Sequence, residues 1–344
     1  MKESYTGNKA LFIGNGINQT EKNNGISWGN LLQKISDRYG IGTDLTNDLK
    51  PFPLAFEEML YSKEGRNDLD GKLRNLKIGI SDILAEDANI LIDNEIHKGF
   101  MKCGIKEIIT TNYDYNLENS LNPNFMDNKL KYSINNQESK LSLYRGYNID
   151  GVSVRHIHGE LKHNRKIASI EKNYPEESIM IGFEHYSDYF IRLQNVIKGE
   201  SGIQKENEKK SLLVRIRDNE AGKIWADLFF THQLIFAGFS LDFSENHLWW
   251  LLLHREEVKR KRNKHDILIN NEIVFCIPQL PMEANEYNIS NEESFYELYK
   301  KRLIRQKSNG VTDVLKSLGI KIDPIVCNNY RDFYLRVIDK YSVI

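Results

Sequence analysis

Four short polar segments carry the residue types from which a binding or catalytic site can be built. They are residues 14–18 (GNGIN), 110–114 (TTNYD), 158–159 (HG) and 238–241 (GFSL). The second supplies a neutral amide, Asn112, which suits the positioning of a ligand or a water. The third supplies an imidazole, His158, the side chain whose ordinary pKa suits a general base near neutral pH. The glycines of the first and last segments let backbone amides approach a phosphate closely.

Each of these segments comes at or just after the end of an apolar run that reads as a β-strand. The runs cover residues 9–13, 107–110, 154–158 and 233–238, and helical patterns separate them. Strands that are apolar throughout and alternate with helices indicate an α/β fold with a mostly parallel sheet covered on both faces. Ligands bind such sheets beyond the carboxyl ends of the strands. We therefore expect all four segments to meet at one edge of the sheet.

The rest of the chain reads as additions to this sheet within a single domain, residues 1–344. Residues 41–104 show no strand pattern and are predicted to be a helical insertion, residues 195–222 a charged excursion, and residues 280–344 the C-terminal completion of the fold. Ser27 is a predicted N-cap for a helix that starts at Trp28. The other expected elements are strands at 141–144, 178–182, 273–277 and 321–326, and helices at 244–259, 291–306 and 330–341.

The composition is that of an ordinary globular protein. Hydrophobic residues make up 40% of the 344 positions and charged residues 28%, with a formal net charge of -1, so there is no global attraction to nucleic acid or membrane. The three cysteines are isolated, so they cannot form the two close pairs of a structural zinc site, and their sparse use fits a reducing compartment. We see no apolar stretch long enough for a signal peptide or a membrane span and expect a cytoplasmic protein.

The four segments together resemble the sirtuin fold, and specifically the sirtuin-like proteins of bacterial antiphage defence, of the Thoeris and HerA-associated types. Those proteins carry a G-N-G or G-A-G turn, a T-T-N-Y-D segment, an H-G pair and a G-x-S-L turn in this order. Here the matches span residues 11–241. The resemblance implies a Rossmann-like sheet of sirtuin type and NAD as the ligand, consumed as a substrate with no metal.

The resemblance also implies roles for single residues. The residues implied to bind NAD are Gly14, Asn15, Gly16 and Ile17 at the diphosphate and nicotinamide half, Gly238, Ser240 and Leu241 at the adenosine half, and Thr111 and Asp114 beside them. Asn112 would hold the nicotinamide ribose or orient an attacking water, and His158 would be the general base. His156 lies on the same face of a regular strand as His158 and remains an alternative base.

Two departures from deacetylating sirtuins narrow the expected reaction. The zinc ribbon with its two CxxC pairs is absent, and the G-x-P-x-F-R segment is replaced by residues 25–28 (GISW). Both argue against protein deacylation and favour hydrolysis of NAD to ADP-ribose and nicotinamide, which would deplete NAD during infection. The alternatives are a non-catalytic module that binds NAD or ADP-ribose and, with less support, an NAD-dependent protein deacylase.

We expect a homo-oligomer controlled by a separately encoded partner, because the chain leaves no room for a sensor domain and free NAD hydrolysis is toxic. In one branch of the resembling systems this partner is a HerA-type ATPase. Trp249 and Trp250 read as a buried helix face, with a subunit interface as the second interpretation. The basic run at residues 259–264 follows Glu256 and Glu257 and reads as a solvated helix end, so we expect no direct nucleic-acid contact.

Overall fold

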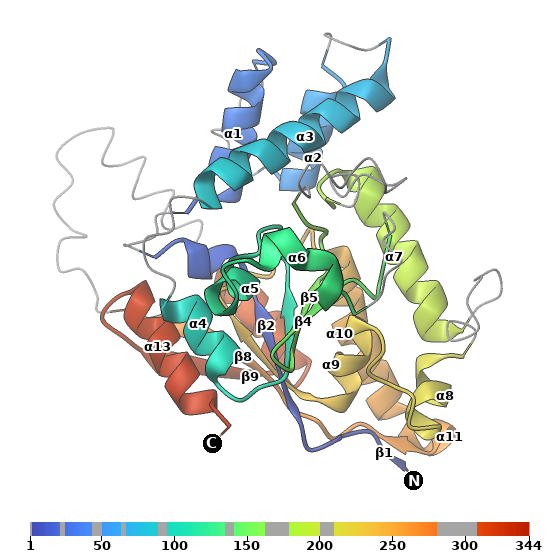
Figure 1. Ribbon diagram of the computed structural model, residues 1–344. Helices are drawn as coiled ribbons and strands as arrows, with labels where there is room; N and C mark the ends of the chain where they lie inside the picture. Colours follow the sequence, from blue (N-terminus) through green and yellow to red (C-terminus); the bar gives the residue numbers. More distant parts are fainter. Residues whose placement is uncertain are drawn as a thin grey trace, which may run out of the picture.

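The centre of the protein is a sheet of seven strands in the order β4-β5-β3-β2-β6-β8-β9 (Figure 1). Neighbouring strands run parallel, except for the antiparallel edge pair β4-β5. The strands are β2 (Lys9–Ile13), β3 (Glu107–Thr110), β4 (Tyr147–Ile149), β5 (Val152–His156), β6 (Gln233–Ala237), β8 (Ile273–Gln279) and β9 (Lys321–Val326). Two short strands, β1 (Lys2–Glu3) and β7 (Ile267–Leu268), form a separate parallel pair. The computed structural model describes residues 2–20, 25–42, 50–62, 67–88, 95–134, 141–161, 179–199, 210–280 and 308–343.

Alternate residues of the central strands enter two different hydrophobic clusters. In β2, Leu11 and Ile13 belong to one cluster, and Ala10 and Phe12 belong to the other. All four side chains are at most 1% exposed. Side chains alternate between the faces of a sheet, so a strand that is apolar throughout must be covered on both sides.

Helices from the N-terminal part and from the C-terminal end of the chain share one hydrophobic cluster with one face of the sheet. They are α1 (Trp28–Arg38), α2 (Phe52–Leu60), α3 (Leu69–Ala88), α4 (Glu95–Lys102), α5 (Asn116–Leu121), α6 (Phe125–Tyr132) and α13 (Tyr330–Tyr341). Helix α1 begins as expected, because Ser27 Oγ accepts a hydrogen bond from the backbone N–H of Asn30 at 3.2 Å. Helices α1, α2 and α3 gather at one end of the molecule, at the top of Figure 1.

The opposite face is covered by the middle of the chain. Its helices are α7 (Phe183–Lys198), α8 (Leu212–Arg217), the 3-10 turn η4 (Trp225–Asp227), α9 (Leu228–Thr231) and α10 (Asn246–Arg260), with the short α11 (Arg262–His265) following and a helical segment at residues 308–317 packing on the same cluster. Figure 1 shows α7, α8, α9 and α10 on the side of the sheet away from α4 and α13.

The expected α/β class with a mostly parallel, Rossmann-like sheet is confirmed, and so are most of its strands. The described part of residues 41–104 is helical, and β9 extends the sheet beside β8. The described part of residues 195–222 contains α8, whose Leu212 and Ile216 are buried in the core. This segment is therefore not wholly an excursion. The helix expected at 291–306 lies outside the described residues.

Two expected strands are wrong. Residues 179–182 form no strand, although their apolar side chains are buried, because the place beside β5 is taken by the antiparallel β4. Their link to the sheet is the bond that the Met180 N–H donates to the His158 carbonyl at 2.7 Å. Residues 141–144 form turns whose Leu143 is buried in the second cluster. In both segments the apolar residues pack without ladder pairing.

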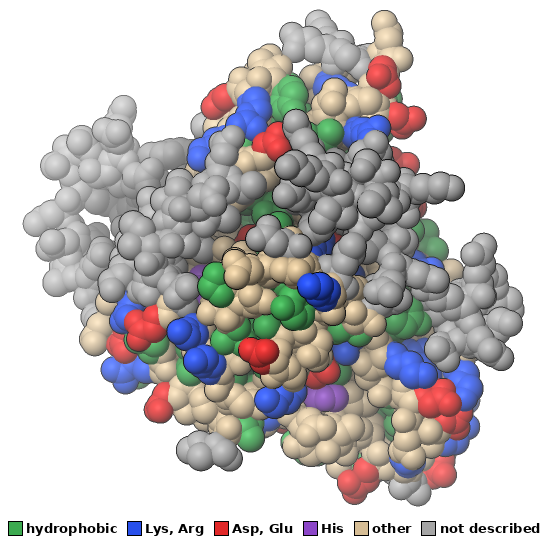
Figure 2. All heavy atoms as spheres, viewed as in Figure 1, with side chains coloured by type: hydrophobic (Ala, Val, Ile, Leu, Met, Phe, Trp, Pro, Cys, Tyr) green, Lys and Arg blue, Asp and Glu red, His purple; other side chains and the backbone are tan. Residues whose placement is uncertain are grey.

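The described surface carries charges of both signs, as the formal net charge of -1 predicts (Figure 2). On the face drawn in Figure 2, basic and acidic side chains of the described residues are interspersed. The basic run that begins at the end of α10 is partly paired with acidic side chains. Lys259 Nζ lies 3.1 Å from Glu256 Oε1, and Lys261 Nζ forms an ion pair with Glu257 Oε1. No helix within the described ranges has the length and apolar character needed to cross a bilayer.

Candidate active site

The four polar segments follow four strands that are neighbours in the sheet, β5, β3, β2 and β6. Ile13, the last residue of β2, is in register with Thr110 of β3 and Ala237 of β6, and Thr110 is in register with His156 of β5. The strands therefore end level with one another. This brings the four segments together at one edge, where parallel α/β sheets bind ligands.

A cavity of about 230 Å³ opens at this edge. Six of the expected ligand-binding and catalytic residues line it: Asn15, Gly16, Thr111, His158, Gly238 and Ser240. Residues that the sequence did not single out also line it, among them Trp28, Tyr113, Tyr186, Asp242 and Glu245. The side chains of Ile17 and Leu241 are fully buried in the two hydrophobic clusters instead. These two residues could meet a ligand only through their backbone.

The glycines are required first by the packing of the two turns on each other. A Cβ atom on Gly14 would lie 2.3 Å from the carbonyl oxygen of Gly238, and one on Gly16 would lie 2.4 Å from the hydroxyl of Tyr334 in α13. The Gly16 N–H donates to the Gly238 carbonyl at 3.0 Å. Gly238 itself has a φ of +67°, which favours glycine. The first turn continues as a 3-10 helix, η1 (Asn15–Asn18), and not directly as an α-helix.

Asp114 holds the first and second segments together. Its Oδ2 accepts a hydrogen bond from Asn18 Nδ2 at 2.9 Å, and its Oδ1 accepts from the backbone N–H of Asn116 at 3.0 Å. Asn18 Nδ2 also lies 2.9 Å from Asn15 Oδ1. Burial raises the pKa of Asp114 more than these hydrogen bonds lower it. Asp114 does not line the cavity, so its visible role is to orient the loop.

Asn112 lies at the junction of β3 and β2 and is buried, with 3% of its surface exposed. Its Nδ2 is 3.5 Å from the Gly14 carbonyl, at the outer limit of a hydrogen bond. Its Oδ1 is buried and has no hydrogen-bond partner among the described residues. Asn112 is not among the residues that line the cavity, although its neighbours Thr111 and Tyr113 are. Buried amide oxygens are normally paired, so the Asn112 oxygen is suited to a water or a ligand group that reaches past these neighbours.

His156 is locked into the protein interior. Its Nδ1 lies 2.9 Å from the carbonyl of Asn112, and its Nε2 lies 2.7 Å from Glu118 Oε1. A carbonyl and an ionised carboxylate can only accept, so both ring nitrogens carry protons. Burial lowers the pKa of His156, but Glu118 outweighs burial and raises it above its ordinary value. A doubly protonated ring with both N–H groups in use has no lone pair for a base.

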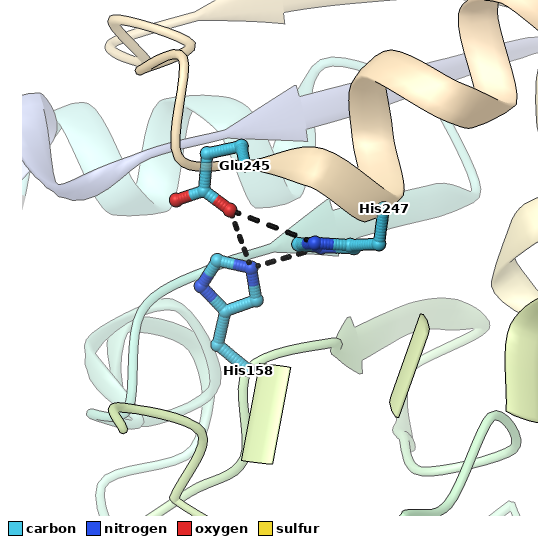
Figure 3. Close-up of side chains that lie close together, drawn as sticks. All are labelled: His158, Glu245 and His247. Atoms are coloured by element: carbon cyan, nitrogen blue, oxygen red, sulfur yellow. Dashed lines mark hydrogen bonds and ion pairs between the residues drawn. The ribbon is translucent and has the colours of Figure 1, made fainter. Parts of the chain in front are cut away.

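His158 lies in a different setting, at the cavity and next to two further titratable groups (Figure 3). Its Nε2 is 3.3 Å from Glu245 Oε2 and 3.2 Å from Nε2 of His247. Its Nδ1 points away from both of them in Figure 3. The following Gly159 has a φ of +93°, so the H-G pair is also a structural requirement of this turn. Burial, reinforced by His158, holds the pKa of His247 well below its ordinary value, and this ring is neutral at pH 7.

The sequence interpretation missed Glu245 and His247, although a signal for them existed. They stand at the start of α10, two residues apart, directly after the fourth polar segment. A helix that follows a strand of this sheet begins at the ligand-binding edge, so polar residues in its first turn were candidates. Elsewhere, at the start of α7, His185 is buried and bonded to Lys77 and the Ile179 carbonyl.

The cavity wall is negative in its described part. Asp242 and Glu245 are carboxylates, and no Lys or Arg is among the lining residues of the described ranges. Burial raises the pKa of Tyr113 and Tyr186 well above the ordinary value, and the Glu245 carboxylate adds to this. Both phenols therefore stay neutral, and the carboxylates set the charge of this part of the wall.

The comparison with protein families matches residues 106–291 to the SIR2-like domain. This stretch is slightly more than half of the chain and includes β3, β5, β6 and β8. The chain belongs to the SIR2-like family. The SIR2-like match contains three of the four polar segments, and the fourth, which begins at Gly14, directly follows β2, the middle strand of the same sheet. Membership of the SIR2-like family implies NAD as the ligand of this edge and fits an NAD-utilising enzyme. A comparison with curated proteins gave no match.

Proposed function

We propose that the protein is an NAD glycohydrolase that cleaves NAD and water to ADP-ribose, nicotinamide and a proton. The bond between C1′ of the ribose and the nicotinamide nitrogen breaks, and its electron pair goes to the nicotinamide. The oxygen of a water forms the new bond to C1′, and His158 accepts the proton of this water. The leaving group is cationic in NAD, so the enzyme needs to bind the dinucleotide, stabilise a positive sugar and position water.

The observation that carries this proposal is the meeting of Asn112 and His158 with both glycine turns at one sheet edge. Asn112 offers a buried amide oxygen without a partner, which suits a ribose hydroxyl or the attacking water. The turns at Gly14 and Gly238 present backbone in the cavity wall, which suits the two halves of the dinucleotide. In this proposal Thr111, Asn15, Gly16 and Ser240 contact NAD, and Gly14, Ile17, Asp114 and Leu241 hold the loops that do so.

Charge supports cleavage at the nicotinamide ribose. Asp242 and Glu245 place negative charge in the cavity wall, where a positively charged sugar would be stabilised as the glycosidic bond breaks. A diphosphate would be repelled from the same place. We therefore assign the part of the cavity near Glu245 and His158 to the nicotinamide ribose.

His158 is suited to act as the general base, because its Nε2 lies next to Glu245 and its Nδ1 points away from Glu245 and His247 (Figure 3). If Nε2 carries the proton, it donates toward Glu245 and leaves the lone pair on Nδ1 to accept a proton from water. In this role Glu245 is a positioning residue, because it acts through His158. Hydrolysis requires no metal in this scheme.

The reaction can be distinguished from simple binding by two measurements on the purified chain. We expect nicotinamide and ADP-ribose to accumulate in equal amounts when the protein is incubated with NAD, as followed by chromatography. Tight NAD binding in a calorimeter without any product would instead support a non-catalytic NAD or ADP-ribose module. A deacylase has less support, because the isolated cysteines Cys103, Cys276 and Cys327 offer no zinc ribbon. NAD-dependent loss of the acetyl group from an acetylated peptide, with transfer of that group to ADP-ribose, would revive that alternative.

We further propose that the protein is the NAD-depleting effector of a bacterial antiphage defence system and works in the cytoplasm. In this proposal residues 1–344 are one domain that forms a homo-oligomer and is held silent by a separately encoded partner such as a HerA-type ATPase. The support is the resemblance of the four segments to those systems. A protein that is monomeric by light scattering and fully active without any partner would contradict the regulatory part.

A further inference from the structure

His158, Glu245 and His247 form a cluster of three metal-ligating side chains at the wall of the cavity (Figure 3). His158 follows β5, whereas Glu245 and His247 stand at the start of α10. Each residue offers one ligand atom, and the three atoms lie within 4.8 Å of one another. The imidazoles of His158 and His247 and Oε2 of Glu245 are almost fully buried, although 12% of the Glu245 side chain is exposed.

The two distances from His158 to its neighbours in the cluster are close to those between ligands of a small tetrahedral cation. Zinc bonds to imidazole nitrogen and carboxylate oxygen measure roughly 2.0–2.2 Å, which at tetrahedral angles places ligand atoms about 3.3–3.6 Å apart. Nε2 of His158 lies 3.3 Å from Glu245 Oε2 and 3.2 Å from Nε2 of His247, and the third pair of ligand atoms, between Glu245 and His247, lies within 4.8 Å. Two imidazoles and one carboxylate are also a ligand set that Zn²⁺ accepts.

Two atoms of the cluster are buried without a hydrogen bond to the described residues, although one of them lies 3.3 Å from His158 Nε2. Glu245 Oε2 and His247 Nδ1 are buried and have no hydrogen-bond partner in the part of the chain that the structure describes. Unpaired buried polar atoms are uncommon, and a cation would satisfy the carboxylate oxygen directly. His158 and Glu245 also line the cavity, so the fourth position of a tetrahedral ion would face the cavity and hold a water.

We propose that His158, Glu245 and His247 form a reversible binding site for a divalent cation of the zinc class, and that the bound cation blocks catalysis. The blocking part rests on the proposed function of His158. A cation on Nε2 takes the lone pair of that nitrogen, so the proton of the neutral ring must sit on Nδ1, which then cannot accept another. The positive end of α10 lies next to the cluster and opposes a cation, which keeps the affinity moderate and the inhibition reversible.

The test measures metal binding directly on the full chain. Titration of the metal-free protein with ZnCl₂ in a calorimeter should show one site, and titration with CoCl₂ should give the intense visible absorption of four-coordinate cobalt. Removal of a residue that only hydrogen-bonds to a metal ligand weakens metal binding roughly 10- to 100-fold. Glu245 is a proposed ligand itself, so Glu245→Gln should weaken Zn²⁺ binding by at least this factor. Glu257→Gln changes a surface carboxylate of the same helix and is the matched control, with unchanged binding expected.

Glu245→Gln is preferred to a variant of His247, because the His247 ring packs against Tyr186, Tyr189 and Trp225 and its loss could disturb folding. A melting temperature like that of the wild type would show that Glu245→Gln folds. No Zn²⁺ binding to the wild type, or equal binding to Glu245→Gln, would overturn the site. If the site binds Zn²⁺ but nicotinamide release is unaffected by it, the blocking role is overturned. If no NAD cleavage exists at all, the calorimetric result still decides the site, so the two proposals fail separately.

Discussion

His156 Nδ1 donates a hydrogen bond to the backbone carbonyl of Asn112 at 2.9 Å. His156 is the last residue of β5, and Asn112 follows the end of the adjacent strand β3 by two residues. The bond fixes the backbone of Asn112, and the second nitrogen of His156 is held by Glu118 at 2.7 Å. His156 therefore supports the residue that we propose as catalytic and is not itself available as the base.

Replacement of His156 should act on stability. His156 and Glu118 are both fully buried, and removal of one partner of such a pair costs about 3–5 kcal/mol. We expect His156→Gln to lower the free energy of unfolding by an amount of this order, measured by urea denaturation. The double variant His156→Gln/Glu118→Gln restores a neutral hydrogen-bonded pair and should recover part of the loss. A stable His156→Gln protein without catalytic activity would instead make His156 the base.

Replacement of Glu245 should act on catalysis through His158. Glutamine keeps the size of Glu245 but removes its charge, so it no longer fixes which nitrogen of His158 carries the proton. We expect Glu245→Gln to lower kcat for nicotinamide release by roughly 10- to 100-fold, a part of the 10²–10⁴-fold that a general base contributes. KM and the melting temperature should change little. A variant with raised KM and unchanged kcat would show that Glu245 binds substrate and does not position the base.

The glycine turns should tolerate no side chain. Gly14→Ala would press its Cβ against the Gly238 carbonyl, which is backbone and cannot move away alone. Overpacking of this kind costs about 1–3 kcal/mol, and it should also displace the turn and weaken NAD binding. Gly29→Ala is the control, because its Cβ would meet open space in the first turn of α1, and alanine there should keep or slightly raise the free energy of unfolding. Equal stability of the two variants would contradict the packing argument.

The C-terminal helix should give the protein part of its acid sensitivity. Burial raises the pKa of Asp323, but hydrogen bonds from Lys340 Nζ at 2.8 Å and Tyr341 Oη at 2.7 Å outweigh burial and hold the pKa below its ordinary value. A depressed carboxylate pKa stabilises the fold above the ordinary Asp pKa, and the stabilisation is lost as the pH falls through the lowered value. Asp323→Asn should therefore lose about 1–2 kcal/mol at pH 7, and the difference from the wild type should vanish in strong acid. A difference that stays constant down to strong acid would show that the charge is not the cause.

The sheet could be predicted because its signals are local. The runs at Lys9–Ile13, Glu107–Thr110 and Gln233–Ala237 each place at least two apolar residues in succession after a polar first residue, and a strand covered on both faces needs this pattern. The two wrong strands show the limit of the same signal. Residues 179–182 are also apolar, but a segment can join the sheet only where a strand still has a free edge. The free edge of β5 is occupied by β4, whose sequence pattern is weaker.

The site could be predicted only in part. The order of the motifs placed four segments at one edge, because every parallel strand of the sheet ends on the same side. The sequence could not say that His156 faces Glu118, since that contact depends on how α5 packs on β5. It also gave no weight to Glu245 and His247, because two polar residues at a helix start are common. Only the fold shows that these two residues belong to the site, because it places the start of α10 beside His158.

The central claim is that Asn112 and His158 carry out cleavage of NAD, and nicotinamide release by single-site variants tests it most directly. The wild type, alone or with the products of neighbouring genes, should release nicotinamide from NAD. His158→Ala should reduce the rate by about 10²–10⁴-fold, and Asn112→Ala by a similar factor. The controls His265→Ala and Asn148→Ala remove the same two side-chain types from α11 and from the edge strand β4, away from the four polar segments, and should keep the wild-type rate. Nicotinamide release that persists at the wild-type rate in both catalytic variants, or never occurs with the wild type, would contradict the account.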